Sequence, residues 1–216
     1  MDIRKQIKLD LISIKPYMIF KNFAVMTFIA ILYMYIMGSP VITISLAMLF
    51  GIIFSSYPFL LGENSGIDGL YRIYGISSKE VVIARYIIAC IIFVLVSIFG
   101  FSYYLILALI KNLPIGLDII EMIAINFVIF ILMVSFQYPI YFKYGYTKAK
   151  TFALIPIFII GGMGMVLGLF KENLKGLYRF MFSHKEVMMV AFGILVLFII
   201  TISIKLAINF YKKRDF

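Results

Sequence analysis

The sequence predicts an all-α, polytopic membrane protein with six transmembrane helices, an N-terminal interfacial amphipathic helix and a short cytoplasmic helix. Three observations lead to this fold class. Hydrophobic residues make up 64% of the 216 residues, 14% are charged, and the mean hydropathy is +1.09. Six apolar runs are long enough to cross a bilayer, and most basic residues lie on alternate connections. A soluble domain of this length cannot bury so much apolar surface, so residues 1–216 are interpreted as one transmembrane domain.

The chain begins with an amphipathic stretch over residues 2–15. One helical face of this stretch carries Ile3, Ile7, Leu11 and Ile14. The other faces carry Arg4, Lys5, Lys8 and Lys15. This pattern favours a helix in the membrane interface with its apolar side in lipid and its lysines at phosphates, and a solvated leader is the alternative. No cleavable targeting peptide is expected, because the next apolar run can span the bilayer and lacks an A-x-A-like cleavage site.

Six membrane spans are expected after this stretch. A hydrocarbon core of about 30 Å requires about 20 apolar residues in a helix. On this measure the spans lie near residues 18–37, 40–61, 80–110, 118–142, 150–170 and 187–210. The third run is longer than a straight span requires, so its first turns are expected to extend into the cytoplasm.

Basic residues indicate the orientation of these spans. With the N-terminus inside, 15 of the 20 lysines and arginines fall on the inner side. These are Arg4, Lys5, Lys8, Lys15, Lys21, Arg72, Lys79, Arg85, Lys143, Lys148, Lys150, Lys205, Lys212, Lys213 and Arg214. The outer side holds Lys111, Lys171, Lys175, Arg179 and Lys185. This excess predicts that both termini are cytoplasmic, and it explains the net charge of +10 by contact with anionic headgroups and not with nucleic acid.

A polar loop over Leu61–Arg85 interrupts the apolar sequence on the inner side. Apolar and aromatic residues recur in it at helical spacing, at Ile67, Leu70, Tyr71 and Tyr74. Ser77 and Ser78 stand just before the third apolar run, where a serine can cap a helix. The pattern therefore predicts a short surface helix that leads into a capped transmembrane helix.

Reactive groups suited to catalysis do not occur in the sequence. It contains no G-x-S-x-G, H-E-x-x-H or Walker A motif. The single histidine, His184, is interpreted as a solvated loop residue, with pH sensing or metal binding as the alternative, and Cys90 as a small buried residue. Asp118 and Glu121 lie at the outer mouth of the fourth span, where a capping role is expected. The chain is therefore expected to bind no metal or cofactor and to be no enzyme, and its weakly polar spans disfavour ion coupling.

Two patterns leave alternatives open. Gly164 and Gly168 form a G-x-x-x-G in the fifth span, which indicates close helix packing or a break that lets the segment re-enter from outside. The following residues, 171–186, mix lysines with aromatic residues and leucines, as in an outer amphipathic helix. Tyr-Pro occurs at positions 57–58 and 138–139, which reflects either a duplicated unit or the common use of proline near helix ends.

Two cytoplasmic segments carry a family resemblance. YPFLLGENSGIDGLYRIYGISSKEVVIARY, from Tyr57 to Tyr86, resembles the loop between spans two and three of small permease subunits of type-2 ABC exporters. The matching positions are Glu63, Gly69, Leu70, Tyr71, Ile76, Ser77, Lys79, Val82, Arg85 and Tyr86. YPIYFKYGYTKAK, from Tyr138 to Lys150, is similar to the stretch after span four in the same family. Together with the basic leader KLDL and six spans in order, the resemblance covers essentially the whole chain.

The chain departs from the family pattern at two places. Tyr74-Gly75-Ile76-Ser77 stands where the family often has Leu-Pro-Ile-Ser, and Thr147 stands where it often has Glu. Glycine in place of proline is expected to make the turn before span three more mobile.

The resemblance implies the permease half of an ATP-driven exporter in the bacterial cytoplasmic membrane. Two permease subunits, identical or closely related, would pair with two ATP-binding subunits that hold ATP and magnesium. The cytoplasmic helix would then be a coupling helix that contacts the ATPase through Glu63, Gly69, Leu70, Tyr71, Arg72, Tyr74 and Ser77. The second cytoplasmic loop would contribute Lys143, Tyr144, Gly145, Tyr146 and Lys148.

The substrate class follows from the character of the spans. Apolar and aromatic walls with few charges favour an amphipathic or hydrophobic substrate, and some relatives are similar to exporters of phenol-soluble modulins or antimicrobial peptides, some with a role in resistance. The alternative function is a non-transporting membrane interaction protein, such as a peptide immunity or sensor subunit. The lack of a strongly polar substrate site is what supports this alternative.

Overall fold

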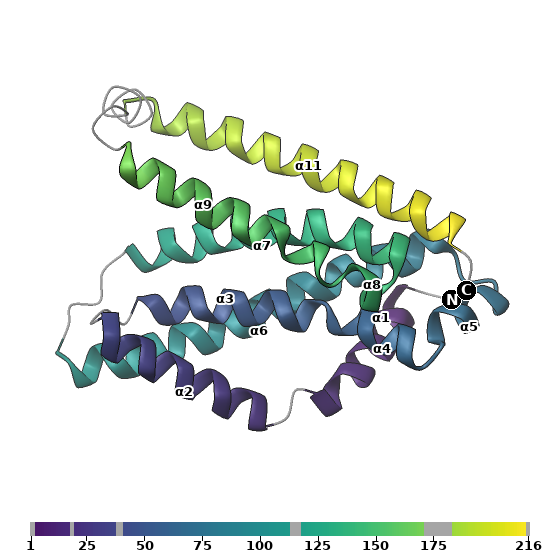
Figure 1. Ribbon diagram of the computed structural model, residues 1–216, viewed down its shortest axis with the longest axis horizontal. Coiled ribbons are helices and arrows are strands. Elements are labelled where there is room, and N and C mark those ends of the chain that lie inside the picture. Colours follow the sequence, from purple (N-terminus) through teal and green to yellow (C-terminus); the bar gives the residue numbers. More distant parts are fainter. Residues whose placement is uncertain (1–2, 18–19, 38–40, 113–117, 171–182, 215–216) are drawn as a thin grey trace.

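A computed structural model describes residues 3–17, 20–37, 41–112, 118–170 and 183–214 of the chain. Every regular element in these ranges is a helix. Figure 1 shows the long helices running side by side in an elongated bundle, with both ends of the chain close together at one end. That end also holds the short helices between the long ones.

The long helices are α2 (Phe20–Met37), α3 (Ile42–Ser55), α6 (Ser78–Ile110), α7 (Asp118–Tyr144), α9 (Ile155–Leu169) and α11 (Lys185–Lys213). The shorter helices are α1 (Ile3–Ile14), α4 (Tyr57–Asn64), α5 (Ile67–Ile73) and α8 (Tyr146–Ala149). Two 3-10 turns, Lys15–Tyr17 and Phe152–Leu154, precede α2 and α9.

Four helices in the described parts of the chain are long and apolar enough to cross a membrane. They cover Ile42–Asn64, Ser78–Ile110, Ile119–Tyr144 and Val190–Lys213. The first combines α3 and α4, which meet at Ser56. These four agree with the predicted spans near 40–61, 80–110, 118–142 and 187–210. The other two predicted spans coincide with α2 and with α9, which has 15 residues.

The centre of the bundle is formed by α3, α6 and α7. Gly100 of α6 lies so close to α3 that a Cβ atom there would be 2.6 Å from the Cβ of Ala47. Thr43 of α3 donates a hydrogen bond to the carbonyl of Gly100 at 3.3 Å. Gly51 of α3 likewise leaves room for Val96 of α6, and a Cβ there would approach its side chain to 2.9 Å. Small residues therefore let α3 and α6 pack with their backbones close together.

The two Tyr-Pro sequences differ in their effect on the helices. A turn at Ser56 separates α3 from α4 just before Pro58, whereas α7 continues through Pro139. Because proline has no N–H, Pro139 cannot donate to the carbonyl of Ser135 four residues earlier, and the Ser203 hydroxyl of α11 donates to that carbonyl at 2.5 Å. Tyr138 in turn donates to the Ser55 carbonyl at 2.8 Å. Hydroxyl groups from neighbouring helices thus bind backbone carbonyls near both prolines.

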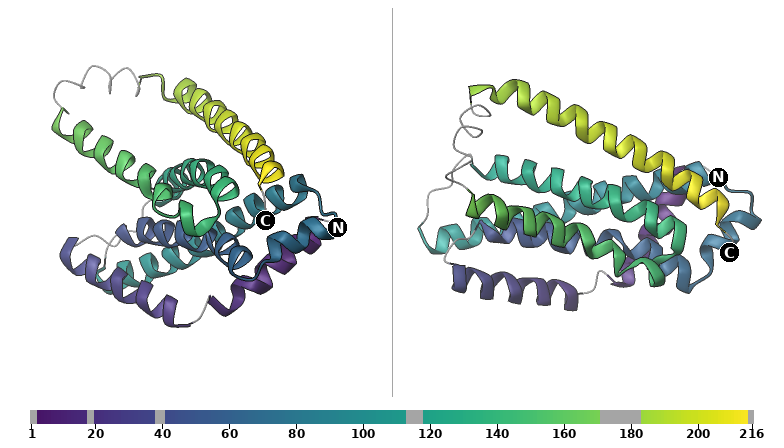
Figure 2. Two further views of the ribbon diagram at one scale, coloured as in Figure 1. Left: turned by 45° about the vertical axis from the view of Figure 1, so that its right-hand side comes forward. Right: turned by 45° about the horizontal axis from the view of Figure 1, so that its top comes forward.

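Helices α9 and α11 lie at the edge of the bundle. Figure 2 shows them diverging away from the end where the termini lie. Helix α9 begins after a 3-10 turn at Phe152–Leu154 and continues through Gly164 and Gly168. The predicted outer amphipathic helix falls largely on 171–182, outside the described residues. His184 precedes α11 and is exposed, in agreement with a solvated position.

The close approach of α3 and α6 generates a prediction. Gly100→Ala should destabilise the protein by about 1–3 kcal/mol, because the new methyl group forces the two helices apart. Thermal unfolding in detergent micelles would measure the change. Gly193→Ala in α11 is the matched control, since a Cβ there meets nothing within 4 Å. Equal stability of the two variants would show that α3 and α6 are not tightly packed at this point.

Candidate functional site

The end of the bundle that holds both termini is organised around a buried arginine. Arg85, in the second turn of α6, has an exposed fraction of 0%. Its Nη2 atom lies 2.5 Å from Oδ1 of Asp68 in α5, and its Nε atom lies 3.9 Å from Oδ2 of Asp10 in α1. A guanidinium that is shielded from water requires such counter-charges. The ion cluster Asp10–Arg85–Asp68 therefore joins α1, α5 and α6.

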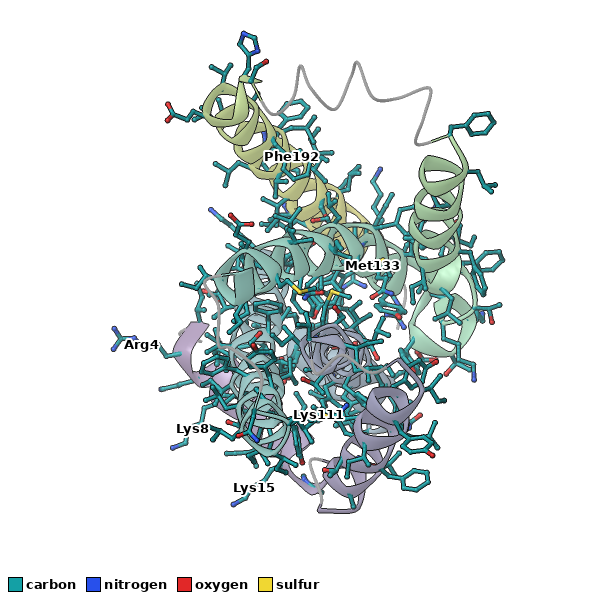
Figure 3. The ribbon with its side chains drawn as sticks, turned by 90° about the vertical axis from the view of Figure 1, so that its left-hand side faces the viewer. Arg4, Lys8, Lys15, Lys111, Met133 and Phe192 are labelled. Atoms are coloured by element: carbon teal, nitrogen blue, oxygen red, sulfur yellow. The ribbon has the colours of Figure 1, made fainter. Side chains whose placement is uncertain are left out.

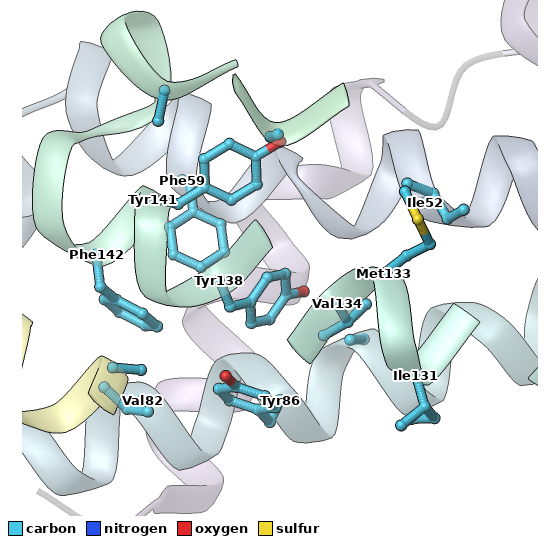
Figure 4. Packing of buried hydrophobic residues seen from close by; sticks show 14 of the residues in the cluster. Ile52, Phe59, Val82, Tyr86, Ile131, Met133, Val134, Tyr138, Tyr141 and Phe142 are labelled. Atoms are coloured by element: carbon cyan, nitrogen blue, oxygen red, sulfur yellow. The ribbon is translucent and has the colours of Figure 1, made fainter. Parts of the chain in front are cut away.

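Aromatic rings complete the surroundings of Arg85. Its guanidinium carbon lies 4.6 Å from the ring centre of Phe59 in α4 and 5.4 Å from that of Phe142 in α7. The two rings also contact each other edge to face, with centres 4.8 Å apart. Figure 4 shows Phe59 and Phe142 in one aromatic cluster with Tyr138 and Tyr141 of α7. These cation–π contacts attach α4 and α7 to the same charge.

A hydrogen bond connects Asp10 to α5. The Tyr71 hydroxyl donates to Oδ1 of Asp10 at 3.3 Å, and both side chains are buried. Burial raises the pKa of Asp10, and the neighbouring Asp68 charge adds to this while Arg85 opposes it. Burial, together with the Asp10 charge, also raises the pKa of Tyr71 well above its ordinary value. Tyr71 therefore stays protonated near neutral pH and can serve as the donor.

The other end of α5 is attached to the C-terminus of α11. Arg72 donates from Nη1 to the carbonyl of Arg214 at 2.5 Å and from Nη2 to the carbonyl of Lys212 at 2.8 Å. The last carbonyls of a helix have no partners within it and attract a cation. Gly66 and Gly75, with φ of +66° and +67°, turn the chain at either end of α5. The helix is thus held on one side by Tyr71 and Asp68 and at its end by Arg72.

The opposite side of α5 is open and apolar. Leu70 is 47% exposed, Ile73 80% and Tyr74 77%. Leu70 and Tyr74 line a groove of about 450 Å³ between α1 and α5. Its other lining residues are Leu9, Ser13, Ile67, Tyr71 and Ile76. An apolar side chain from another protein could enter this groove.

Glu63, at the end of α4, connects the segment 57–86 with the segment 138–150. Its Oε2 atom accepts hydrogen bonds from the backbone N–H groups of Tyr146 at 2.5 Å and Thr147 at 3.2 Å, which begin α8. Gly145 has φ of +79°, and a Cβ there would lie only 2.7 Å from that oxygen. A glycine is therefore required for the carboxylate to reach the start of α8.

The remaining predicted residues lie around these contacts. The Ser77 hydroxyl accepts from the N–H of Lys79 at 3.3 Å and caps α6, and Gly69 is half-buried in α5. The Lys143 ammonium lies 4.8 Å from the ring centre of Tyr144 and 5.0 Å from that of Phe210. Tyr144 and Lys148 are exposed, and both line a second groove of about 500 Å³. The other walls of that groove are Phe136, Ile140, Phe152 and Ile155.

Comparison with known families identifies the chain. A family model described as ABC-2 family transporter protein matches residues 6–212. The chain belongs to this family. Comparison with curated proteins and with solved structures found no match in either set. Because the matched range covers almost the whole chain, the ABC-2 family membership applies to the membrane helices and to the cytoplasmic segments alike.

In this ABC-2 protein the structure shows which of the predicted contact residues are exposed and which are buried. Tyr71 was expected to contact a partner, but it is 6% exposed and points to Asp10. Arg72 donates to the end of α11, whereas Tyr74 is open to solvent. Sequence reasoning did not identify Asp10 or Asp68 as functional. One sequence feature could have indicated these two carboxylates. Arg85 lies within the predicted span 80–110, and a charge inside a span requires a counter-ion.

Metal chemistry finds no support in the described ranges. No group of three or more histidine, cysteine, aspartate or glutamate residues there could hold a metal ion. Of the acidic residues at this end, Asp10 and Asp68 belong to the ion cluster and Glu63 binds the start of α8.

The ion cluster generates a prediction about its two carboxylates. Asp68→Asn should destabilise the protein by about 3–5 kcal/mol, because it removes the close partner of a buried charge. Asp10→Asn should lower the stability of the protein much less, because the cluster then holds one cation and one anion. Since the folded pKa of Asp10 is raised, its charge lowers stability as pH rises above about 3.8, and Asp10→Asn should remove this slope. Unfolding temperatures measured across pH would test both variants. An equal loss of stability in the two variants would contradict the assignment of Asp68 as the main partner of Arg85.

A second prediction concerns Glu63. Glu63→Ala should remove both hydrogen bonds to α8 and destabilise that turn by about 1–2 kcal/mol. Hydrogen exchange at Tyr146 and Thr147 should accelerate accordingly. Glu186→Ala, at the first turn of α11, provides an exposed acidic control for which exchange at these two amides should not change.

Proposed function

We propose that this protein is the permease subunit of an ATP-driven exporter and that a separate ATP-binding subunit supplies the energy. Membership of the ABC-2 family and four helices of membrane-spanning character support the permease role. The sequence has no Walker A motif, so nucleotide binding is assigned to the partner together with its magnesium. The basic inner segments support a bacterial cytoplasmic membrane location with both termini inside.

Six spans remain our proposal for the topology, with α2 and α9 as the two additional ones. Helix α2 has 18 residues of mainly apolar character, and α9 with its preceding turn lies beside α7. Both ends of the chain lie at the same end of the bundle, which requires an even number of crossings (Figure 1). Helix α1 then lies at the cytoplasmic membrane surface, but its apolar residues Ile7, Leu11 and Ile14 pack against the bundle and not into lipid, contrary to the sequence prediction.

The observation that carries the coupling role is the two-sided character of α5. Its inner side is fixed by Asp68 and Tyr71, while its outer side presents Leu70 and Tyr74 beside the groove against α1. A helix that is held from behind and apolar in front can transmit the movement of a bound partner to the bundle. We therefore assign α5 as the coupling helix and the ATPase as the protein that enters the groove.

The second cytoplasmic segment extends this contact. Tyr144 and Lys148 are exposed, and Glu63 joins α8 to the end of α4. A displacement of α4 and α5 would therefore reach α7 and α9 through α8. This arrangement supports a role for both segments in coupling to the ATPase.

A second permease subunit and an amphiphilic substrate complete the proposal. Helices α9 and α11 expose large apolar side chains, among them Phe158, Val190, Leu197 and Phe198. Lipid or a second permease can cover them, and the weakly polar interior favours an amphipathic or hydrophobic substrate such as a peptide. ATP-dependent accumulation of such a peptide in inverted vesicles, with the ATPase co-expressed, would separate an exporter from an immunity or sensor subunit that binds without transport.

The coupling role generates a prediction about assembly. Leu70→Ser combined with Tyr74→Ala should weaken binding of the ATPase by about 2–4 kcal/mol, because two exposed anchors of the groove are lost. Co-purification and ATP turnover of the complex would measure the loss. Tyr35→Ala, which removes an 89% exposed tyrosine from α2, is the control and should leave assembly unchanged. Normal assembly of the double variant would rule out α5 as the contact helix.

A further inference from the structure

The outer side of α1 carries a second groove that the coupling role does not use. This groove of about 440 Å³ is lined by Arg4, Ile7, Lys8, Leu11, Ile12 and Lys15. Figure 3 shows Arg4, Lys8 and Lys15 projecting outward along one side of the bundle. The groove against α5 is formed by other residues of α1, Leu9 and Ser13. The two grooves therefore lie on different sides of the same helix.

The outward side of α1 is rich in positive charge. Residues 4, 8, 11 and 15 recur at intervals of three to four, so they form one stripe along the helix. All three cations of the stripe are exposed. The only acidic residue of α1, Asp10, is 5% exposed and faces Arg85. The outward side of α1 thus presents three positive charges to whatever lies beside it.

The floor of the groove is apolar. Ile12 is 56% exposed, while Ile7 and Leu11 are half-buried and pack against the core around Ile14. A site for a free anion requires no apolar floor. A ligand that contacts both the cations and the apolar floor has a negatively charged group next to a hydrocarbon chain.

The depth of α1 indicates where such a ligand comes from. Ile14, next to Lys15, packs in one cluster with Phe54 of α3 and with Ile88 of α6. Ile88 belongs to the apolar run that follows Arg85, so this end of α1 lies beside the apolar part of a spanning helix. The cations of the stripe are therefore level with lipid headgroups, where basic residues attract anionic lipid.

We propose that the outer side of α1 is a binding site for an anionic phospholipid of the cytoplasmic leaflet. Arg4, Lys8 and Lys15 bind its phosphate region, and Ile12 contacts the first part of an acyl chain. Because Asp10 on the inner side of the same helix pairs with Arg85, the bound lipid also holds α1 against the ion cluster. This inference requires membrane insertion only, and it does not depend on export.

Lipid titration of the full chain in detergent, followed by native mass spectrometry, tests the site. The wild-type protein should bind phosphatidylglycerol more tightly than phosphatidylcholine. Lys8→Gln combined with Lys15→Gln should weaken phosphatidylglycerol binding about 25-fold, at about fivefold for each lysine. Lys212→Gln combined with Lys213→Gln removes the same charge at the same end of the molecule and should change binding less than about twofold.

Four results would overturn the proposal. Equal losses of phosphatidylglycerol binding in the two double variants would indicate that the net charge of the protein attracts the lipid and that no specific site exists. Ile12→Ser should weaken phosphatidylglycerol binding. Unchanged binding in this variant would indicate a site for free anions. Displacement of the lipid by inorganic phosphate would indicate the same. Loss of ATPase co-purification in the Lys8 and Lys15 variant with lipid binding intact would assign the stripe to a protein partner. Since the titration contains no ATPase, its failure leaves the proposed export function untouched.

Discussion

The end of the bundle that holds both termini depends on the burial of one positive charge. Arg85 stands where the apolar run of α6 begins, and water does not reach its guanidinium. Such a charge is stable only with counter-charges, which the chain provides by bringing Asp10 and Asp68 to it from α1 and α5. Phe59 and Phe142 add the faces of two rings. One side chain of α6 therefore positions four other helices, because each contributes a group that contacts the arginine.

The buried charge also attaches the polar loop to the bundle. Helix α5 has only seven residues and would not be stable alone in water. Its attachment through Asp68, Tyr71 and Arg72 makes it part of the bundle and leaves Leu70 and Tyr74 exposed. Glu63 then adds α8 to the same unit through two backbone hydrogen bonds. A force applied to the exposed side of α5 consequently acts on α6 and α11 directly, and on α7 through α8.

The bundle divides into a tightly packed centre and an open periphery. Glycines let α3 and α6 approach each other closely, and the Ser203 and Tyr138 hydroxyls donate to the carbonyls of Ser135 and Ser55 near the two prolines. Helices α9 and α11, by contrast, expose large apolar side chains to their surroundings. The close helix contacts therefore lie at the centre of the bundle, and exposed apolar surface lies at its edge.

The sequence by itself determined the helical class, the position of the apolar spans and the short helix in the polar loop. These features follow from local periodicity and from the length of apolar runs, which need no knowledge of neighbours. Only the tertiary structure decided which side of α5 faces inward. Tyr71 and Tyr74 share the same helical spacing, and the side that carries Asp68 is the buried one because it meets Arg85. Periodicity gives the angles between side chains around a helix, but the pairing of charges from distant segments decides which face of the helix is buried.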